Sequence, residues 1–184
     1  MNREIVFLLE ERSAQAMLEG FIQKIIPTDI TPRYIVFEGK QDMEKQMELR
    51  LRGYRVPDAQ FVVLRDQDSG DCKPVKEKLL KKCDNVGKSN ALVRIACREL
   101  ESWYLADLAA VERGLNVSGL AHLQNKNPYR SPDSLSRPSE RLARIAPSYQ
   151  KVGGSRAIGP YLDLKNTRSH SFAVFIKGFQ KLFN

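Results

Sequence analysis

Short apolar runs alternate with amphipathic segments over the first two thirds of the chain. The apolar runs are rich in Val, Ile, Leu and Phe and have the length of buried strands. They occupy residues 3–9, 33–38, 60–65 and 91–97. The segments between them are predicted helices: 13–26 places apolar side chains at the i, i+3, i+4 and i+7 spacing of a helix face, and 41–54 is a charged surface helix. They occupy residues 13–26, 41–54, 73–83 and 98–114. Four strand–helix units in series predict an α/β fold whose mostly parallel sheet is covered by helices.

After Gly114 the pattern changes, and no sustained period continues. Residues 119–140 are rich in Asn, Ser, Pro and basic side chains and are predicted to form a long loop. A short helix over 138–146 follows, and 149–164 are expected to be a polar connection. The final segment, 169–183, carries an apolar stripe at helical spacing that we expect to dock on the core. The predicted domains are an α/β core, 1–117, and a basic loop and helical extension, 118–184.

Composition is that of a globular protein of 184 residues, with 42% hydrophobic and 28% charged side chains. This length suits one domain with a real hydrophobic core. The first apolar run is too short for a signal peptide or a membrane span, so a cytoplasmic protein without a membrane association is expected. Cys72, Cys83 and Cys97 have neither an even count nor a metal-ligand spacing, and we expect three free thiols.

The net charge of +8 is unevenly distributed along the chain. Residues 1–117 hold 19 basic and 19 acidic side chains, whereas 118–184 hold 11 basic and 3 acidic ones. This asymmetry favours a phosphate-rich partner such as DNA or RNA, although a solvated basic surface is the simpler alternative. Tyr129 and Tyr149 could stack on unpaired bases. The candidates for binding phosphate or nucleic acid are Lys40, Lys126, Arg130, Lys151, Arg156 and Arg168.

Carboxylates recur where the predicted strands end. They are Glu10, Glu11, Glu38, Asp66, Asp68 and Glu99. Ligands of open parallel sheets bind beyond the carboxyl ends of the strands, so these side chains are expected at one edge. Residues two apart on an extended backbone point the same way, which would let Asp66 and Asp68 face one site. Hard oxygen ligands of this kind suit Mg²⁺.

The acidic loop also has a simpler interpretation, because Asp, Ser and Gly are the commonest turn residues. Asp71 is better assigned to capping the next helix. Of Glu99 and Glu101, which point to different faces of a helix, we expect Glu99 to reach the site. The alternative for Glu99 is a favourable charge at a helix N-terminus. Carboxylates gathered at one edge repel one another unless a cation or a shared proton relieves them.

Several stretches resemble a known bacterial family. "FEGKQD", "FVVLRDQDSGDC", "LVRIACRELESWYLAD", "YQKVGG" and "RSHSF" are similar to domain-of-unknown-function family 4276, which is Toprim-like and related to overcoming-lysogenization-defect nucleases. The resemblance implies a Toprim-like, Rossmann-like four-stranded sheet. It also implies that Glu10 is a general acid or base or a metal ligand, and that Asp66 and Asp68 hold Mg²⁺ or Mn²⁺. Glu11 departs from the pattern, because Toprim domains usually have Gly there.

The expected function is a Mg²⁺-dependent nuclease, with Glu10, Asp66, Asp68 and Glu99 as the catalytic residues. The resemblance further implies an AAA or ABC-type ATPase partner and a phage-defence or toxin-like role. A catalytically inactive adaptor or regulatory subunit is the alternative, favoured by Glu11, and a small-molecule phosphohydrolase is a third. The sequence leaves the oligomeric state open, a homo-oligomer included.

Overall fold

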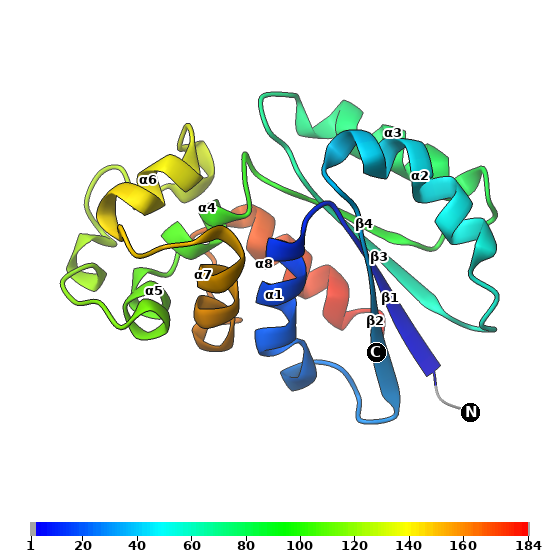
Figure 1. Cartoon of the computed structure of the whole chain (residues 1–184), viewed down its shortest axis with the longest axis horizontal. Coiled ribbons are helices and arrows are strands. Elements are labelled where there is room, and N and C mark those ends of the chain that lie inside the picture. Colours follow the sequence, from blue (N-terminus) through cyan, green and yellow to red (C-terminus); the bar gives the residue numbers. More distant parts are fainter. Residues whose placement is uncertain (1–2, 184) are drawn as a thin grey trace.

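The computed structural model describes residues 3–183 and consists of one four-stranded sheet with helices on both faces (Figure 1). The strands are β1 (Arg3–Leu9), β2 (Ile30–Val36), β3 (Gln60–Asp66) and β4 (Leu92–Ala96). Their order is β2-β1-β3-β4, and every neighbouring pair is parallel. The predicted α/β class and the four predicted strands are therefore confirmed.

Eight α-helices connect and extend the sheet within the described residues. They are α1 (Arg12–Phe21), α2 (Lys40–Gly53), α3 (Cys72–Asp84), α4 (Glu101–Leu105), α5 (Leu108–Leu115), α6 (Pro138–Ile145), α7 (Lys151–Ile158) and α8 (His170–Gln180). Short 3-10 turns lie at Ile22–Lys24, Ala121–Leu123, Pro132–Ser134 and Gly159–Tyr161. Figure 1 shows α2 and α3 on one face of the sheet and α1 and α8 on the other, with α4 to α7 to the left of α1 and α8 in this view.

The alternation of side chains along the strands divides the core into two clusters. Ile5, Phe7 and Leu9 of β1 pack with α1, α4, α5, α7 and α8. Val6 and Leu8, which point the opposite way, pack with α2 and α3. Both faces of β1 are fully covered, as a central strand of a parallel sheet requires. The apolar stripe of α8 is buried in the first cluster, which confirms that this helix docks on the core.

Two predicted elements differ from the structure. The single helix expected over 98–114 is two helices, because the chain turns at Asp107 and the side chain of this residue caps α5 by accepting a hydrogen bond from the Ala110 N–H at 3.1 Å. The polar connection expected over 149–164 contains helix α7. Its glycines indicated a turn, but Gly154 lies inside the helix, where a Cβ atom would overlap the ring of Tyr149.

Two helices of the segment after residue 117 have different neighbours. α7 lies against α1, and α8 lies against β4. The long loop before Pro138 contains only short 3-10 turns among its regular elements, as expected. The three cysteines are free. No helix among residues 3–183 has the length and hydropathy needed to cross a membrane.

Candidate functional site

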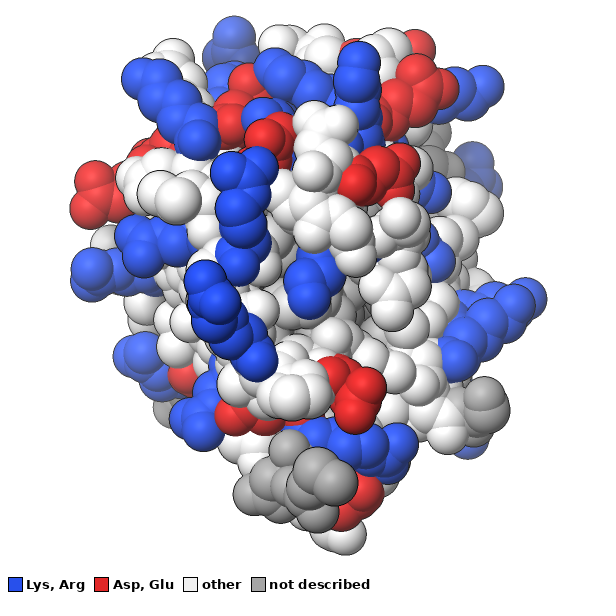
Figure 2. All heavy atoms as spheres, turned by 90° about the vertical axis from the view of Figure 1, so that its right-hand side faces the viewer, with Lys and Arg blue, Asp and Glu red and all other residues white. Residues whose placement is uncertain are grey.

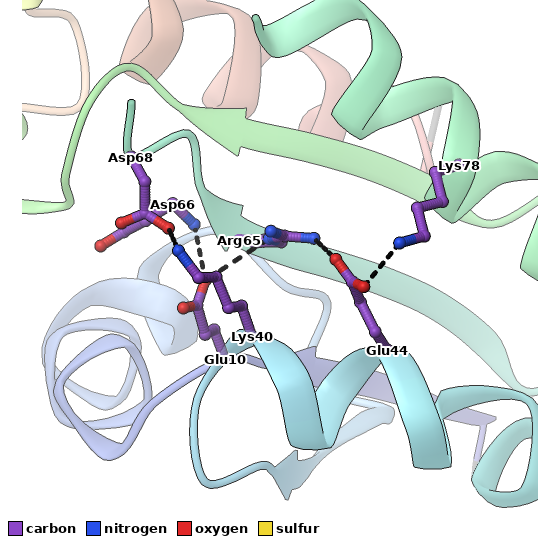
Figure 3. Close-up of polar contacts among 7 residues, drawn as sticks. All are labelled: Glu10, Lys40, Glu44, Arg65, Asp66, Asp68 and Lys78. Carbon is purple, nitrogen blue, oxygen red and sulfur yellow. Dashed lines mark hydrogen bonds and ion pairs between the residues drawn. The ribbon is translucent and has the colours of Figure 1, made fainter. Parts of the chain in front are cut away.

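The candidate site lies where β1 and β3 end side by side. β1 has β2 on one side and β3 on the other, so the direction of the connections reverses between β1 and β3. This is the position at which open α/β sheets bind ligands. Glu10 follows β1, and its Oε2 accepts a hydrogen bond from the Asp66 backbone N–H at 3.1 Å (Figure 3). Glu10 is 8% exposed, so two of the predicted site residues meet in a nearly buried place.

Arg65 lies beside Glu10 and was missed in the sequence. The strand register brings the residue after Leu9 next to the residue after Leu64, so Glu10 neighbours Arg65. Arg65 Nε is 3.8 Å from Glu10 Oε2, and Arg65 Nη1 is 2.7 Å from Glu44 Oε1 on α2. Figure 3 shows this row of alternating charges continuing to Lys78 on α3, whose Nζ is 2.6 Å from Glu44 Oε2. The signal in the sequence was a charged residue inside an otherwise apolar strand.

Asp66 points to the other face of the sheet, toward Glu101. It is two residues after Leu64, which packs in the cluster with α1 and α4. Glu101 is 1% exposed, and its Oε1 accepts a hydrogen bond from Tyr149 Oη at 2.9 Å. Its Oε2 is buried without a hydrogen-bond partner among the described residues. The structure thus places Glu101, which we had ranked below Glu99, in the electrostatic environment of Asp66.

Glu99 has a different neighbour. Its Oε2 accepts a hydrogen bond from the Ser139 N–H at 2.7 Å, in the first turn of α6. The alternative interpretation of Glu99, a negative charge at a helix N-terminus, therefore fits its geometry, but the helix is α6 rather than the one that follows Glu99. Glu99 also lines a hollow of about 280 Å³ together with Asp68 and Arg137.

Asp68 is outside β3, and the expected alternation with Asp66 does not apply to it. The strand ends at Asp66, and Asp68 has a left-handed backbone with φ 57°. Its Oδ2 is 2.9 Å from the Nζ of Lys40, at the start of α2. The extended backbone from which we expected Asp66 and Asp68 to face one site therefore ends before Asp68, and the shared site stays a prediction. Asp71 caps α3 as expected, by accepting a hydrogen bond from the Lys73 N–H at 3.0 Å.

Glu11 occupies the position at which Toprim domains usually have Gly. Its backbone is extended, with φ −144°, so the turn does not require the left-handed conformation that favours glycine. Its carboxylate Oε2 is 2.5 Å from the Nζ of Lys151, at the start of α7. Burial tends to lower the pKa of Lys151, but the hydrogen bond to Glu11 and the charges of Glu11, Glu101 and Asp66 outweigh it and raise this pKa.

The other predicted binding residues are not brought to this edge by any contact in residues 3–183. The exposed side chains of Lys126, Arg130, Arg156 and Arg168 form no ion pair within that range. Tyr129 and Tyr149 are 7% and 8% exposed and belong to the core. The predicted stacking of bases on these two rings is therefore wrong, because their faces are already packed.

Burial is the main cause of the raised pKa values of the acidic residues at this site. It raises the pKa of Glu10, and the nearby charges of Asp68 and Glu11 raise it further, against the Asp66 N–H and Arg65, which lower it. Burial, followed by the charges of Glu101 and Glu10, raises the pKa of Asp66 well above its ordinary value. Burial also raises the pKa of Glu101. Three neighbouring carboxyl groups thus resist ionisation together, which a bound cation would relieve.

The fit to a metal ion rests on these carboxylates. Among residues 3–183, no group of three or more His, Cys, Asp or Glu side chains is arranged to hold a metal ion. Mg²⁺, however, is commonly held by one or two carboxylates together with phosphate oxygens and water. Glu10 and Asp66 line a hollow of about 10 Å³, roughly the space of one water molecule or ion. Glu10 and Asp66 are therefore the two carboxylates that could hold Mg²⁺ or Mn²⁺ in this hollow, whose lining does not include Glu101.

Comparison with known proteins agrees with this fold. The structure is similar to the C-terminal region of the Burkholderia pseudomallei OLD protein, with a TM-score of 0.58 and 14% identity over 97% of each chain. The four-stranded sheet flanked by helices is therefore Toprim-like. No curated protein matches the sequence. A profile of the family described as "Domain of unknown function (DUF4276)" matches residues 9–180, and the chain belongs to this family.

Proposed function

We propose that this protein is a Mg²⁺- or Mn²⁺-dependent nuclease that hydrolyses phosphodiester bonds of DNA or RNA at the carboxyl edge of its sheet. The observation that carries the proposal is the meeting of Glu10, Asp66 and Glu101 at the topological switch point, with the pKa of each carboxyl group raised. Clusters of titratable groups with shifted pKa values in such a position are typical of active sites.

Glu10, Asp66 and Asp68 would hold the metal ion, which when bound polarises a phosphate and acidifies water. Glu10 is also suited to accept or donate a proton, because its raised pKa brings it closer to neutral pH. The Asp66 N–H orients its carboxylate by a hydrogen bond, and the Arg65 Nε lies 3.8 Å from the same oxygen. Glu99, predicted as catalytic, would act through α6, whose first turn it binds.

Two lysines are in position to receive the negative charge of a substrate. Lys40 and Lys151 each hold a carboxylate at the rim of the site, Asp68 and Glu11 respectively. A phosphate group of the substrate could replace the carboxylate as the partner of either ammonium group when that carboxylate binds a metal ion. The basic excess after residue 117 supports a polyanionic substrate.

The second candidate is a catalytically inactive adaptor. It is favoured by the ion pairs Lys40–Asp68 and Arg65–Glu10, because these cations already neutralise two of the predicted metal ligands. In both cases we propose an AAA or ABC-type ATPase as partner in a defence or toxin-like system, on the basis of the resemblance to overcoming-lysogenization-defect nucleases.

A cleavage assay separates the two candidates. Labelled single-stranded and duplex DNA and RNA are incubated with the protein and Mg²⁺, Mn²⁺ or EDTA. The nuclease proposal expects cleavage that requires the metal and is lost in the Asp66→Ala/Asp68→Ala variant. Full activity of this variant would exclude the proposed site, and the absence of cleavage of every substrate, with and without the partner ATPase, would favour the adaptor.

A further inference from the structure

We propose that α6 provides a phosphate-binding groove that holds a nucleic acid strand next to the acidic site. The groove is formed by Arg137, Arg141 and Arg144, which belong to the basic last third of the chain. The inference rests on the proposed function for the identity of the polymer, a phosphodiester chain. The groove itself is defined by two adjoining hollows and by arginines whose charges are not compensated.

The first hollow, of about 440 Å³, is lined by Ser136, Arg137, Glu140, Arg141 and Arg144. The second, of about 280 Å³, contains Asp68 of the candidate site together with Glu99. Ser136 and Arg137 line both, so the two hollows are neighbours at these residues. A ligand held along α6 would therefore reach the carboxylate edge without leaving the protein surface.

The arginines are spaced to follow an extended anion. Arg141 and Arg144 are three residues apart on one side of α6, and Arg137, the N-cap residue with a left-handed backbone, lines the same hollow. With a rise of about 1.5 Å per residue, they extend over roughly 10 Å. This length spans more than one phosphate of a nucleic acid strand, whereas a free phosphate ion would fill a small part of it.

The charge of this row is largely uncompensated within residues 3–183. Arg137 forms an exposed pair with Glu140 at 3.4 Å, and neither Arg141 nor Arg144 forms an ion pair in that range. The Nε of Arg141 is buried without a hydrogen-bond partner among these residues. An unpaired buried donor on a cation is costly.

The groove is held in place relative to the site. Glu99 follows β4 and accepts a hydrogen bond from the first turn of α6, and Leu142 anchors the helix in the core. Figure 2 shows the opposite end of the molecule, where Lys and Arg side chains are numerous and several lie side by side, with Asp and Glu side chains among them. Arg52, in the last turn of α2, and Arg55, just after this helix, are both exposed and serve as matched control positions.

The test is the binding of a fluorescein-labelled single-stranded oligonucleotide, measured by anisotropy in EDTA so that no metal-dependent cleavage occurs. Arg141→Gln/Arg144→Gln is compared with Arg52→Gln/Arg55→Gln, which removes the same charge elsewhere. We expect the α6 variant to lose about tenfold or more in affinity and the control to lose less than about threefold. The slope of log affinity against log salt should fall in magnitude by about 1.4 in the α6 variant.

The inference is overturned if the α6 variant binds like the wild type, or if the control variant loses as much. The single variant Arg144→Gln, at an exposed position, should give part of the same loss and guards against misfolding of the double variant. Cleavage is scored separately. If the wild type cleaves and the α6 variant binds normally, the nuclease proposal stands and the groove proposal fails. If binding depends on α6 but no metal-dependent cleavage is observed, the groove proposal stands and the nuclease proposal fails.

Discussion

At the residue scale, two neighbouring side chains of β3 have opposite environments. Arg65 faces α2 and joins Glu10 to Glu44, whereas Asp66 faces α4 and the buried Glu101. The sequence predicts a carboxylate cluster at this edge from the ends of the strands. It does not predict that Glu101 lies at this edge. The two-residue separation shows that Glu99 and Glu101 lie on different faces of a helix, but it does not show which of the two faces meets the sheet.

Replacing Asp66 with Asn should stabilise the protein at pH 8. The folded state raises the pKa of Asp66, so it retains a proton that the unfolded chain has released. The free energy of unfolding therefore falls as the pH rises from the ordinary pKa of aspartate to the raised pKa of Asp66 in the folded state. Above that raised pKa the loss is complete. We expect the Tm of Asp66→Asn to exceed that of the wild type at pH 8 by about 2–4 °C for each kcal/mol relieved, and the difference to vanish near pH 4.

The matched control is Asp68→Asn, which breaks the partly exposed pair with Lys40 and should not raise the Tm. Thermal denaturation followed by circular dichroism measures both variants in metal-free buffer. A Tm of Asp66→Asn at or below that of the wild type at pH 8 would contradict the assigned environment of Asp66.

Replacing Arg65 with Met should destabilise the fold strongly. Arg65 is 6% exposed, and its loss leaves Glu10 and Glu44 without their shared cation. Removing one partner of a buried ion pair costs about 3–5 kcal/mol. Lys78→Met removes the exposed end of the same row and should cost about 1 kcal/mol or less. Urea unfolding compares the two, and similar losses would show that Arg65 is not the central member of the row.

At the scale of elements, helix α7 makes a close contact that the sequence pattern does not predict. Gly154 lies against Tyr149, whose hydroxyl group binds Glu101. The glycine pair at 153–154 indicated a turn, because glycine disfavours helices. The packing of the Tyr149 ring overrides that preference, and such a tertiary contact cannot be derived from a local pattern.

Gly154→Ala should therefore lower stability by about 1–3 kcal/mol, since the added methyl group displaces the ring of Tyr149. Gly153→Ala is the matched control in the same helix, where an added Cβ has space, and it should raise stability by up to about 1 kcal/mol. Free energies of unfolding in urea decide this prediction. Equal effects of the two variants would contradict the role assigned to Gly154.

The four strands and the helices α1, α2, α3 and α8 were predictable from the sequence within a few residues. β1 and β3 are continuous apolar runs, as expected for strands covered on both faces. The break at Asp107 was not predicted, because the apolar pattern continues across it while the capping side chain starts a new helix.

At the scale of the whole molecule, the fold brings together residues that are far apart in the chain. Glu10 from β1, Asp66 from β3, Glu101 from α4 and Lys151 from α7 meet beyond the strand ends. The strand ends are visible in the sequence, but the position of α6 and α7 above them is set by tertiary packing. The basic excess of the last third is accordingly divided between exposed side chains and the α6 groove.

The central claim is that this edge binds a divalent cation through Asp66. Its most direct test is a Mn²⁺ titration followed by the electron paramagnetic resonance signal of the free ion, in the presence of a non-cleavable oligonucleotide. We predict saturable Mn²⁺ binding by the wild type and by Glu77→Gln, which removes an exposed carboxylate of α3. Binding should be weakened about tenfold or more in Asp66→Asn. Equal Mn²⁺ binding by the wild type and Asp66→Asn, or no saturable binding at all, would contradict the account.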